Sequence, residues 1–323
     1  MKLLRVCFAV MLAFGLSACT ANTEDDAHID TTETNPESSS ENKPPENESK
    51  KLPAHQLLTK DRAPISSLDA EEGMTIDVLE VGLKNVVVQL KETGHTVAFD
   101  KYLSAYILGD YSFENKKTHK NIRCDAFLAV ELGDEILFYD FDYYMFLDES
   151  LYLRDIDGDG LDEIIVWQQV GASGGEGQHC SFVFKIINDE LKMIFESGPS
   201  RSKFDTGFSG TLQDGFELKI ENKFTSYSIT LDLKTNRHFD KNGKVTIRED
   251  MAVYCFTKFI PEDIDGDGIF EIVCSQYASL GYHNEGIGKA KSILKFNSTL
   301  QTFEVIQAEF IPQKGVSAVA ETL

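Results

Sequence analysis

The strongest constraint in this sequence is an acidic, glycine-containing motif that occurs twice. The first copy is Asp155-Ile-Asp-Gly-Asp-Gly-Leu-Asp-Glu163, and the second copy, 108 residues further along, is Asp263-Ile-Asp-Gly-Asp-Gly-Ile-Phe-Glu271. Each copy runs directly into an apolar segment rich in isoleucine and valine, and a Gly-rich stretch and a second apolar segment follow. Self-similarity of this extent indicates an internal structural repeat, so the chain is expected to contain two similar β-rich units.

The spacing of the acids in this motif predicts two structural calcium sites. Acids at positions 1, 3, 5 and 9 place carboxylates on one side of a tight loop, where a hard cation can take several oxygens at about 2.3 to 2.6 Å. We expect Gly160 and Gly268 to adopt the positive φ of a sharp turn. The alternative is an acidic turn without a metal. The predicted ligands are Asp155, Asp157, Asp159, the carbonyl of Leu161 and Glu163 in the first loop, and Asp263, Asp265, Asp267, the carbonyl of Ile269 and Glu271 in the second.

The surroundings of the motif exclude an EF-hand, which needs a glutamate at position 12 and a helix on each side. Position 12 is Val166 in the first copy and Cys274 in the second, and both lie in strand-like sequence. The motif instead resembles the calcium loops of FG-GAP/VCBS repeats, which form the blades of integrin-α-type β-propellers. This resemblance is specific at the two loops and extends over residues 120–310. It implies a calcium-stabilised propeller or a related all-β fold used for display and binding, without a fixed enzymatic activity.

The sequence from about residue 60 onward predicts an all-β fold. Short β-rich runs, such as 163–170 and 181–188, are separated by Gly, Asn and Asp at short intervals, and this pattern is typical of sandwiches, barrels and propellers. Half of the repeat offset is close to the length of a four-stranded blade, so a degenerate blade is expected near Asp214 and Gly215. We therefore expect a β-propeller or a propeller-like array of four-stranded antiparallel sheets. Helical periodicity is confined to 54–62 and 102–108.

The N-terminal region predicts export and attachment to a membrane. Residues 1–18 contain two cations and then an apolar run that ends in small residues, as in a signal peptide. Leu16-Ser-Ala-Cys19 resembles the bacterial lipobox, which implies that Cys19 carries acyl chains; a plain secretory signal is the alternative. Residues 19–59 contain the lipidated cysteine and a tether that is acidic and too poor in apolar residues to fold, and residues 60–323 form the β domain.

Charge and motif context limit the other functions. The chain has 31 Lys+Arg against 53 Asp+Glu, so it lacks the cationic surplus that nucleic-acid binding needs. The segment 171–175 fits the Gly-x-Ser-x-Gly pattern of a hydrolase nucleophile at Ser173, but it leads into a strand-like segment, whereas a nucleophile elbow leads into a helix. Four cysteines beyond residue 19 either form disulfides after export or stay as thiols: Cys124, Cys180, Cys255 and Cys274.

Together these features predict an exported envelope protein, held on the cell membrane through Cys19, or on the outer membrane where the envelope has two. Its calcium-stabilised domain would serve as a binding or adhesion module for an extracellular protein or glycan. No catalytic constellation is evident, so we expect no enzymatic activity. The alternatives are an envelope-bound hydrolase that uses Ser173 and an accessory subunit of an envelope complex.

Overall fold

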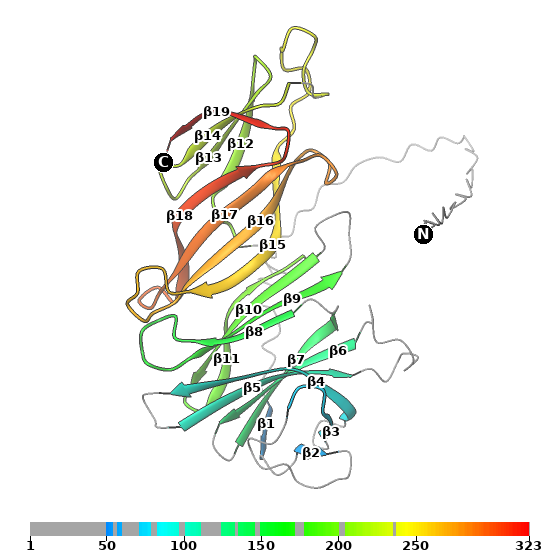
Figure 1. Cartoon of the computed structure of the whole chain (residues 1–323), viewed down its shortest axis with the longest axis vertical. Helices are drawn as coiled ribbons and strands as arrows, with labels where there is room; N and C mark the ends of the chain where they lie inside the picture. The colour runs from blue at the N-terminus through cyan, green and yellow to red at the C-terminus, as the bar shows by residue number, and fades with distance from the viewer. Residues whose placement is uncertain are drawn as a thin grey trace, which may run out of the picture. The chain divides into compact units, whose positions relative to one another are not determined.

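A computed structural model of the chain shows an all-β protein (Figure 1). The chain divides into two units, residues 1–46 and 47–323, and the fold described below belongs to the second unit. The structure describes residues 50–53, 57–59, 71–78, 83–96, 101–110, 124–132, 135–145, 149–171, 178–199, 204–234 and 237–322. Within these ranges no residue is helical, so the prediction of an all-β protein is confirmed. The predicted signal peptide and Cys19 lie outside these ranges.

The part of the chain that the structure describes also contains no helix that is long and apolar enough to cross a membrane.

The first sheet, sheet A, has seven antiparallel strands in the order β1-β7-β6-β5-β4-β3-β2. Its first two strands, β1 and β2, fall within the range that we assigned to the tether. The strand bounds are β1 Lys50–Pro53, β2 Leu57–Thr59, β3 Thr75–Val78, β4 Leu83–Thr96, β5 Lys101–Asp110, β6 Cys124–Leu132 and β7 Glu135–Met145.

Strand β5 contains residues 102–108, for which helical periodicity was noted, and that expectation is wrong. The strand is buried on both faces: Leu103, Ala105 and Ile107 join one core, and Tyr106 and Leu108 join another. A strand buried on both faces has a continuous apolar sequence, and periodicity alone does not separate it from a buried helix.

Three four-stranded antiparallel sheets follow. Sheet B has the order β11-β10-β9-β8, sheet C the order β12-β13-β14-β19, and sheet D the order β15-β16-β17-β18. The strand bounds are β8 Glu149–Arg154, β9 Glu163–Gly171, β10 Gln178–Ile187, β11 Glu190–Ser197, β12 Phe208–Gln213, β13 Glu217–Asn222, β14 Ser228–Asp232, β15 Met251–Glu262, β16 Glu271–Leu280, β17 Gly286–Asn297, β18 Thr302–Pro312 and β19 Ser317–Thr322.

Sheets B and D are the two copies of the predicted repeat. Both are meanders in which the acidic motif joins the first strand to the second, β8 to β9 and β15 to β16. The pairing to the third strand is also equivalent, because Ile164 pairs with Phe184 and Ile272 pairs with Leu294. The internal repeat inferred from the sequence is therefore a repeat of four-stranded sheets.

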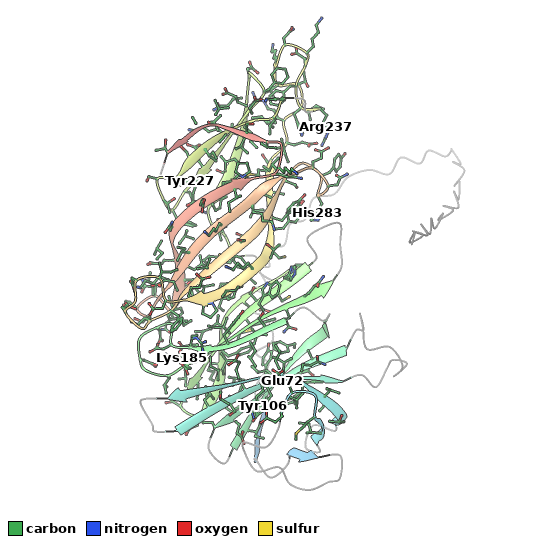
Figure 2. The ribbon with its side chains drawn as sticks, in the orientation of Figure 1. Glu72, Tyr106, Lys185, Tyr227, Arg237 and His283 are labelled. Carbon is green, nitrogen blue, oxygen red and sulfur yellow. The ribbon has the colours of Figure 1, made fainter. Side chains whose placement is uncertain are left out.

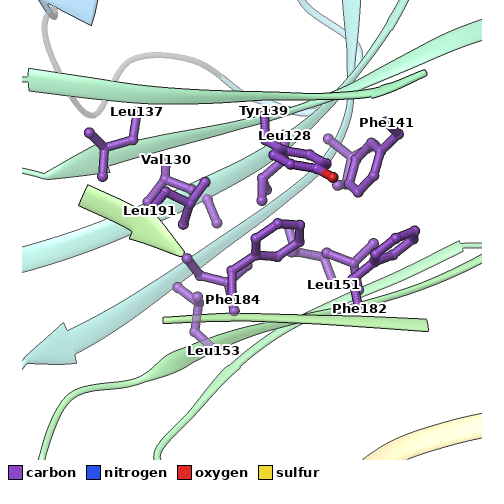
Figure 3. Packing of buried hydrophobic residues seen from close by; sticks show 14 of the residues in the cluster. Leu128, Val130, Leu137, Tyr139, Phe141, Leu151, Leu153, Phe182, Phe184 and Leu191 are labelled. Carbon is purple, nitrogen blue, oxygen red and sulfur yellow. The ribbon is translucent and has the colours of Figure 1, made fainter. Parts of the chain in front are cut away.

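The sheets pack in an order that differs from their order along the chain. Sheet B packs on sheet A through a core that contains Leu128, Tyr139, Phe182 and Phe184 (Figure 3). Its other face, which carries Ile165 and Val183, packs on sheet D. Sheet D contacts sheet B through residues near the beginning of β16, such as Ile272 and Cys274, and sheet C through Ala278 and Leu280 near its end.

This arrangement corrects the expected blade order. In a propeller, sheets adjacent in sequence are neighbours in space, whereas here sheet C lies between B and D in sequence and yet B packs directly on D. The described sheets form no closed ring. The Asp214-Gly215 pair lies in the turn between β12 and β13 of sheet C, where Gly215 has a φ of 102°. The described residues thus contain the predicted four-stranded antiparallel sheets, but these sheets are not arranged in the closed ring of a propeller.

Candidate functional site

The two acidic loops have the same backbone and hydrogen-bond geometry. The first loop spans residues 155–162, between β8 and β9, and the second spans 263–270, between β15 and β16. Both have positive φ at positions 4 and 6: 79° and 81° at Gly158 and Gly160, and 78° and 87° at Gly266 and Gly268. The expectation for Gly160 and Gly268 is therefore confirmed.

Aspartate side chains accept hydrogen bonds from the loop backbone in each copy. Asp155 accepts the N–H groups of Gly158 and Gly160 at 2.7 and 2.9 Å, and Asp159 accepts the N–H of Leu161 at 2.8 Å. The second loop has the equivalent bonds, from Gly266 and Gly268 to Asp263 at 2.8 and 3.2 Å and from Ile269 to Asp267 at 2.8 Å. These bonds hold the aspartate side chains against the backbone of their own loop.

The glutamate at position 9 links the end of each loop to its beginning through a hydrogen bond. Glu163 and Glu271 are the first residues of β9 and β16, and both are buried, with exposures of 0% and 2%. Each accepts the backbone N–H of position 2: Ile156 at 2.9 Å for Glu163 and Ile264 at 3.2 Å for Glu271. The second oxygen of Glu163, Oε1, is buried and accepts no hydrogen bond within the described part of the protein.

The structure brings most of the predicted ligands together. Oxygens of Asp155, Asp157 and Glu163 lie within 4.8 Å of one another in the first loop, and oxygens of Asp263, Asp265 and Asp267 do so in the second. These groups consist of side-chain oxygens, and the carbonyls of Leu161 and Ile269 stay predicted ligands. Asp159 and Glu271 lie outside these two groups, and each also pairs with a lysine that was not among the predicted site residues.

A lysine from the third strand of each sheet reaches into the acidic loop. The ammonium of Lys185, on β10, forms ion pairs with Asp157, with Asp159 at 2.8 Å and with Glu163 Oε1 at 3.3 Å (Figure 2). Lys295, on β17, lies 2.7 Å from Glu271 and 3.7 Å from Asp265. Lys185 directly follows Phe184, which pairs with Ile164, and Lys295 directly follows Leu294, which pairs with Ile272. The two lysines therefore occupy equivalent positions in the repeat.

The two loops differ in how deeply the charges are buried. The Lys185 side chain is 12% exposed and that of Lys295 is 39% exposed. Burial is the main cause that raises the pKa of Glu163 to about 8, and the nearby Asp157 carboxylate also raises it. The hydrogen bond from the N–H of Ile156 and the Lys185 ammonium both lower this pKa, but they do not cancel the effect of burial. Burial lowers the pKa of Lys185, but its hydrogen bonds to Asp157 and Asp159 outweigh this and the pKa is raised. The first loop is thus the more desolvated of the two.

The loops also contact each other. The N–H of Phe270, at the end of the second loop, donates to the carbonyl of Asp155, at the start of the first, at 2.8 Å. The Ile269 side chain lies over Gly158, where a Cβ atom would come within 2.8 Å of its Cδ1. The Arg154 guanidinium lies 5.4 Å from the centre of the Phe270 ring. The two copies of the motif, 108 residues apart in sequence, therefore form one continuous surface.

Among the residues that the structure describes, the other candidates do not assemble into a catalytic site. Ser173 lies outside the described residues. His179 is buried in β10 and stacks on Trp167, with 4.6 Å between ring centres. Cys180, Cys255 and Cys274 are buried thiols, and Cys274 pairs in register with Phe259 rather than with Cys255. The side chain of Cys124 lies outside the description.

Comparison with known proteins points to a family other than the one expected. Residues 206–311 match the family described as the YybI C-terminal domain. A curated relative, protein YybI of Bacillus subtilis strain 168, is 24% identical over 154 residues, which cover 46% of this chain. The chain spans 57% of the length of that relative. No solved structure matches.

The FG-GAP/VCBS assignment is therefore wrong. The matched range runs from before β12 to near the end of β18, so it includes the second acidic loop but not the first. A short acidic loop leading into a strand constrains only the local geometry, and two copies of it do not specify the family of the surrounding sheets.

Proposed function

We propose that the two acidic loops bind calcium for structural reasons. The observation that carries this proposal is that carboxylate oxygens of Asp155, Asp157 and the buried Glu163 lie within 4.8 Å of one another in a loop already folded around carboxylates. The residues fit a cation, because an ammonium group already lies against the same oxygens in each loop. In each loop, the four carboxylates of the predicted ligands and one ammonium together have a formal charge of −3 when all are ionised.

The first loop would hold calcium through Asp155, Asp157, Asp159, Glu163 and the carbonyl at position 7, and the second loop through the equivalent residues. Bound calcium would supply positive charge that offsets the repulsion among these carboxylates. The chain's own contribution is to hold the oxygens together by the backbone hydrogen bonds described above. Because the loops contact each other, ordering one loop also supports the packing of sheet B on sheet D.

We further propose that the protein is an exported lipoprotein and that its β domain is a binding or adhesion module. Support for the anchor is the Cys19 motif and the acidic segment after it, which would hold the domain away from a membrane. Support for the binding role is the surface that the two loops form, which is acidic and is exposed at residues 263–268. The proposed ligand is an extracellular protein or glycan.

Calcium binding is tested by thermal unfolding of the full-length chain with calcium or with a chelator. At a calcium concentration 100-fold above Kd, one site adds about 2.7 kcal/mol to the free energy of unfolding. Asp265→Asn keeps the acceptor for the N–H of Asp267 and should reduce this gain. The control is Asp189→Asn, in the turn between β10 and β11, where φ is 61° and asparagine is well tolerated. Equal melting temperatures in calcium and in chelator would contradict the proposal.

The envelope role has two separate tests. Cys19→Ser should abolish the incorporation of labelled fatty acid into the protein, and incorporation equal to that of the wild type would exclude an anchor at this residue. Binding is tested by passing the protein over immobilised glycans, peptidoglycan and surface proteins with and without calcium. Retention that depends on calcium and is lost in Asp265→Asn supports a ligand-binding loop surface; no retention on any of these supports counts against it.

A further inference from the structure

A second group of potential metal ligands lies at the opposite end of β16 from the acidic loop. It consists of His238 and Glu249, from the segment before β15, and Glu285, from the hairpin between β16 and β17. Figure 2 shows the neighbouring Arg237 in this part of the protein. All three residues fall within the range that matches the YybI C-terminal domain.

The distances in this group fit a shared metal ion. His238 Nε2 lies 3.6 Å from Glu249 Oε2 and 3.6 Å from Glu285 Oε2, and the three atoms lie within 4.8 Å of one another. Ligand atoms about 2.1 Å from a tetrahedral zinc ion are roughly 3.4 Å apart. The separations are thus close to those of a coordination shell and longer than hydrogen bonds of this type, which are about 2.7 to 2.9 Å when charge-assisted.

The fold fixes each of these side chains. The His238 side chain is 0% exposed, and its backbone carbonyl accepts the N–H of Thr246 at 2.8 Å, which closes the segment on itself. The N–H of Glu285 donates to the carbonyl of Tyr282 at 2.9 Å in the β16–β17 hairpin. Gly281 leaves the space that Glu249 fills, because a Cβ atom there would come within 1.9 Å of Glu249 Oε2. The site is therefore built by backbone geometry as well as by charge.

Arg237 bridges the two carboxylates from outside. Its Nε donates to Glu285 Oε1 at 2.8 Å and its Nη2 donates to Glu249 Oε2 at 2.5 Å. Glu285 Oε2, the oxygen that faces His238, is a buried atom and accepts no hydrogen bond from the described residues. Arg237 thus orients both glutamates and leaves one carboxylate oxygen directed at the imidazole.

We propose that His238, Glu249 and Glu285 bind one divalent transition-metal ion, with zinc as the best-fitting ion. An imidazole nitrogen combined with carboxylate oxygens suits zinc, whereas calcium takes oxygen ligands. Two carboxylates and one guanidinium leave a charge of −1, which a divalent cation offsets. Three protein ligands leave a fourth position for water or for a ligand from outside.

Such an ion would fasten the segment before β15 to the β16–β17 hairpin. The site uses no residue of the acidic loops and lies at the other end of sheet D, so it does not rest on the calcium proposal. Its position places it beside the half of sheet D that packs on sheet C.

The test is isothermal titration of zinc chloride into the full-length chain, stripped of metal and kept in excess calcium chloride so that calcium competes for the acidic loops. The wild type should take up one equivalent of zinc more than Glu285→Gln, or bind it at least about tenfold more tightly. Cobalt chloride gives a second readout, because a four-coordinate cobalt site absorbs strongly in the visible range and this band should be lost in His238→Gln.

The matched control is Glu309→Gln, on β18 of the same sheet, where the carboxylate pairs with Lys291 at 3.5 Å at the surface. This variant should bind zinc as the wild type does. The melting temperature of Glu285→Gln in chelator should equal that of the wild type, which shows that the variant folds. Zinc uptake that is absent in the wild type, or that is equal in the wild type and Glu285→Gln, would overturn the proposal and leave the group as an ion-paired cluster.

Discussion

Replacing Lys185 with methionine should have opposite effects on stability and on calcium binding. The methionine keeps an apolar stem of similar length and removes the ammonium that pairs with Asp157, Asp159 and Glu163. Removing one partner of a buried ion pair costs about 3 to 5 kcal/mol. Because the Asp159 side chain is 41% exposed, the lower end, about 3 kcal/mol, is expected without calcium. Calcium affinity should rise, because the ammonium no longer competes for the same oxygens.

The assay is thermal unfolding of the full-length chain in chelator and in saturating calcium. A loss of about 3 kcal/mol lowers the melting temperature by about 6 to 12 °C for a domain of this size. In calcium the loss should shrink to under about 1 kcal/mol. Lys295→Met, at the more exposed position, should lose about 1 kcal/mol or less in chelator. Lys192→Met, which removes an exposed pair with Glu190 on β11, is the control and should change stability by under about 0.5 kcal/mol.

Two results would refute this reasoning. An equal loss of stability for Lys185→Met in chelator and in calcium would show that no cation replaces the ammonium. Weaker calcium binding by the variant would show that the lysine supports the site and does not compete with it.

Three further predictions concern the contacts of the loops. Gly158→Ala should destabilise the protein by at least about 1 kcal/mol more than Gly266→Ala in denaturant melts, because both have positive φ but only the first would press on Ile269; equal losses would count against the contact between the loops. The raised pKa of Glu163, about 8 against 4.5, means that this carboxyl stabilises the calcium-free fold fully below pH 4.5 and that this contribution is lost as the pH rises through 8. Glu163→Gln should flatten that fall in chelator, and an unchanged pH profile would show that another group causes it. Phe256→Ala, which empties part of the core between sheets B and D, should cost about 3 to 5 kcal/mol, and a loss under about 1 kcal/mol would show that the two sheets do not depend on it.

The sequence predicted the local structure of the loops because short-range rules determine it. Glycines at positions 4 and 6 supply positive φ, and aspartates at positions 1, 3 and 5 cap the backbone of their own loop, so both copies fold alike whatever surrounds them. The β-rich runs were recognisable for the same reason, and the run predicted at 163–170 is β9, Glu163–Gly171. The calcium that these patterns predict stays a prediction.

The packing of the sheets and the lysines in the loops depend on contacts between distant segments. The sequence of β12 to β14 does not reveal that sheet C packs on sheet D and not on sheet B. This packing is determined by apolar faces that meet only in the folded chain. Lys185 and Lys295 could have been identified from the sequence, because each follows the apolar residues of the segment after the Gly-rich stretch in its copy of the repeat. The group at His238 had no repeat or motif that could reveal it, because its ligands come from two separate segments.

Strand β19 gives sheet C an unusual dependence on distant sequence. Ser228 on β14 pairs with Thr322 on β19, 94 residues later, and all of sheet D is synthesised between them. At about 5 to 20 residues per second, the outer edge of β14 stays open for roughly 5 to 20 seconds during translation. An open strand edge is a template for pairing with another chain, so β14 is exposed to such pairing until β19 has been made and covers its edge.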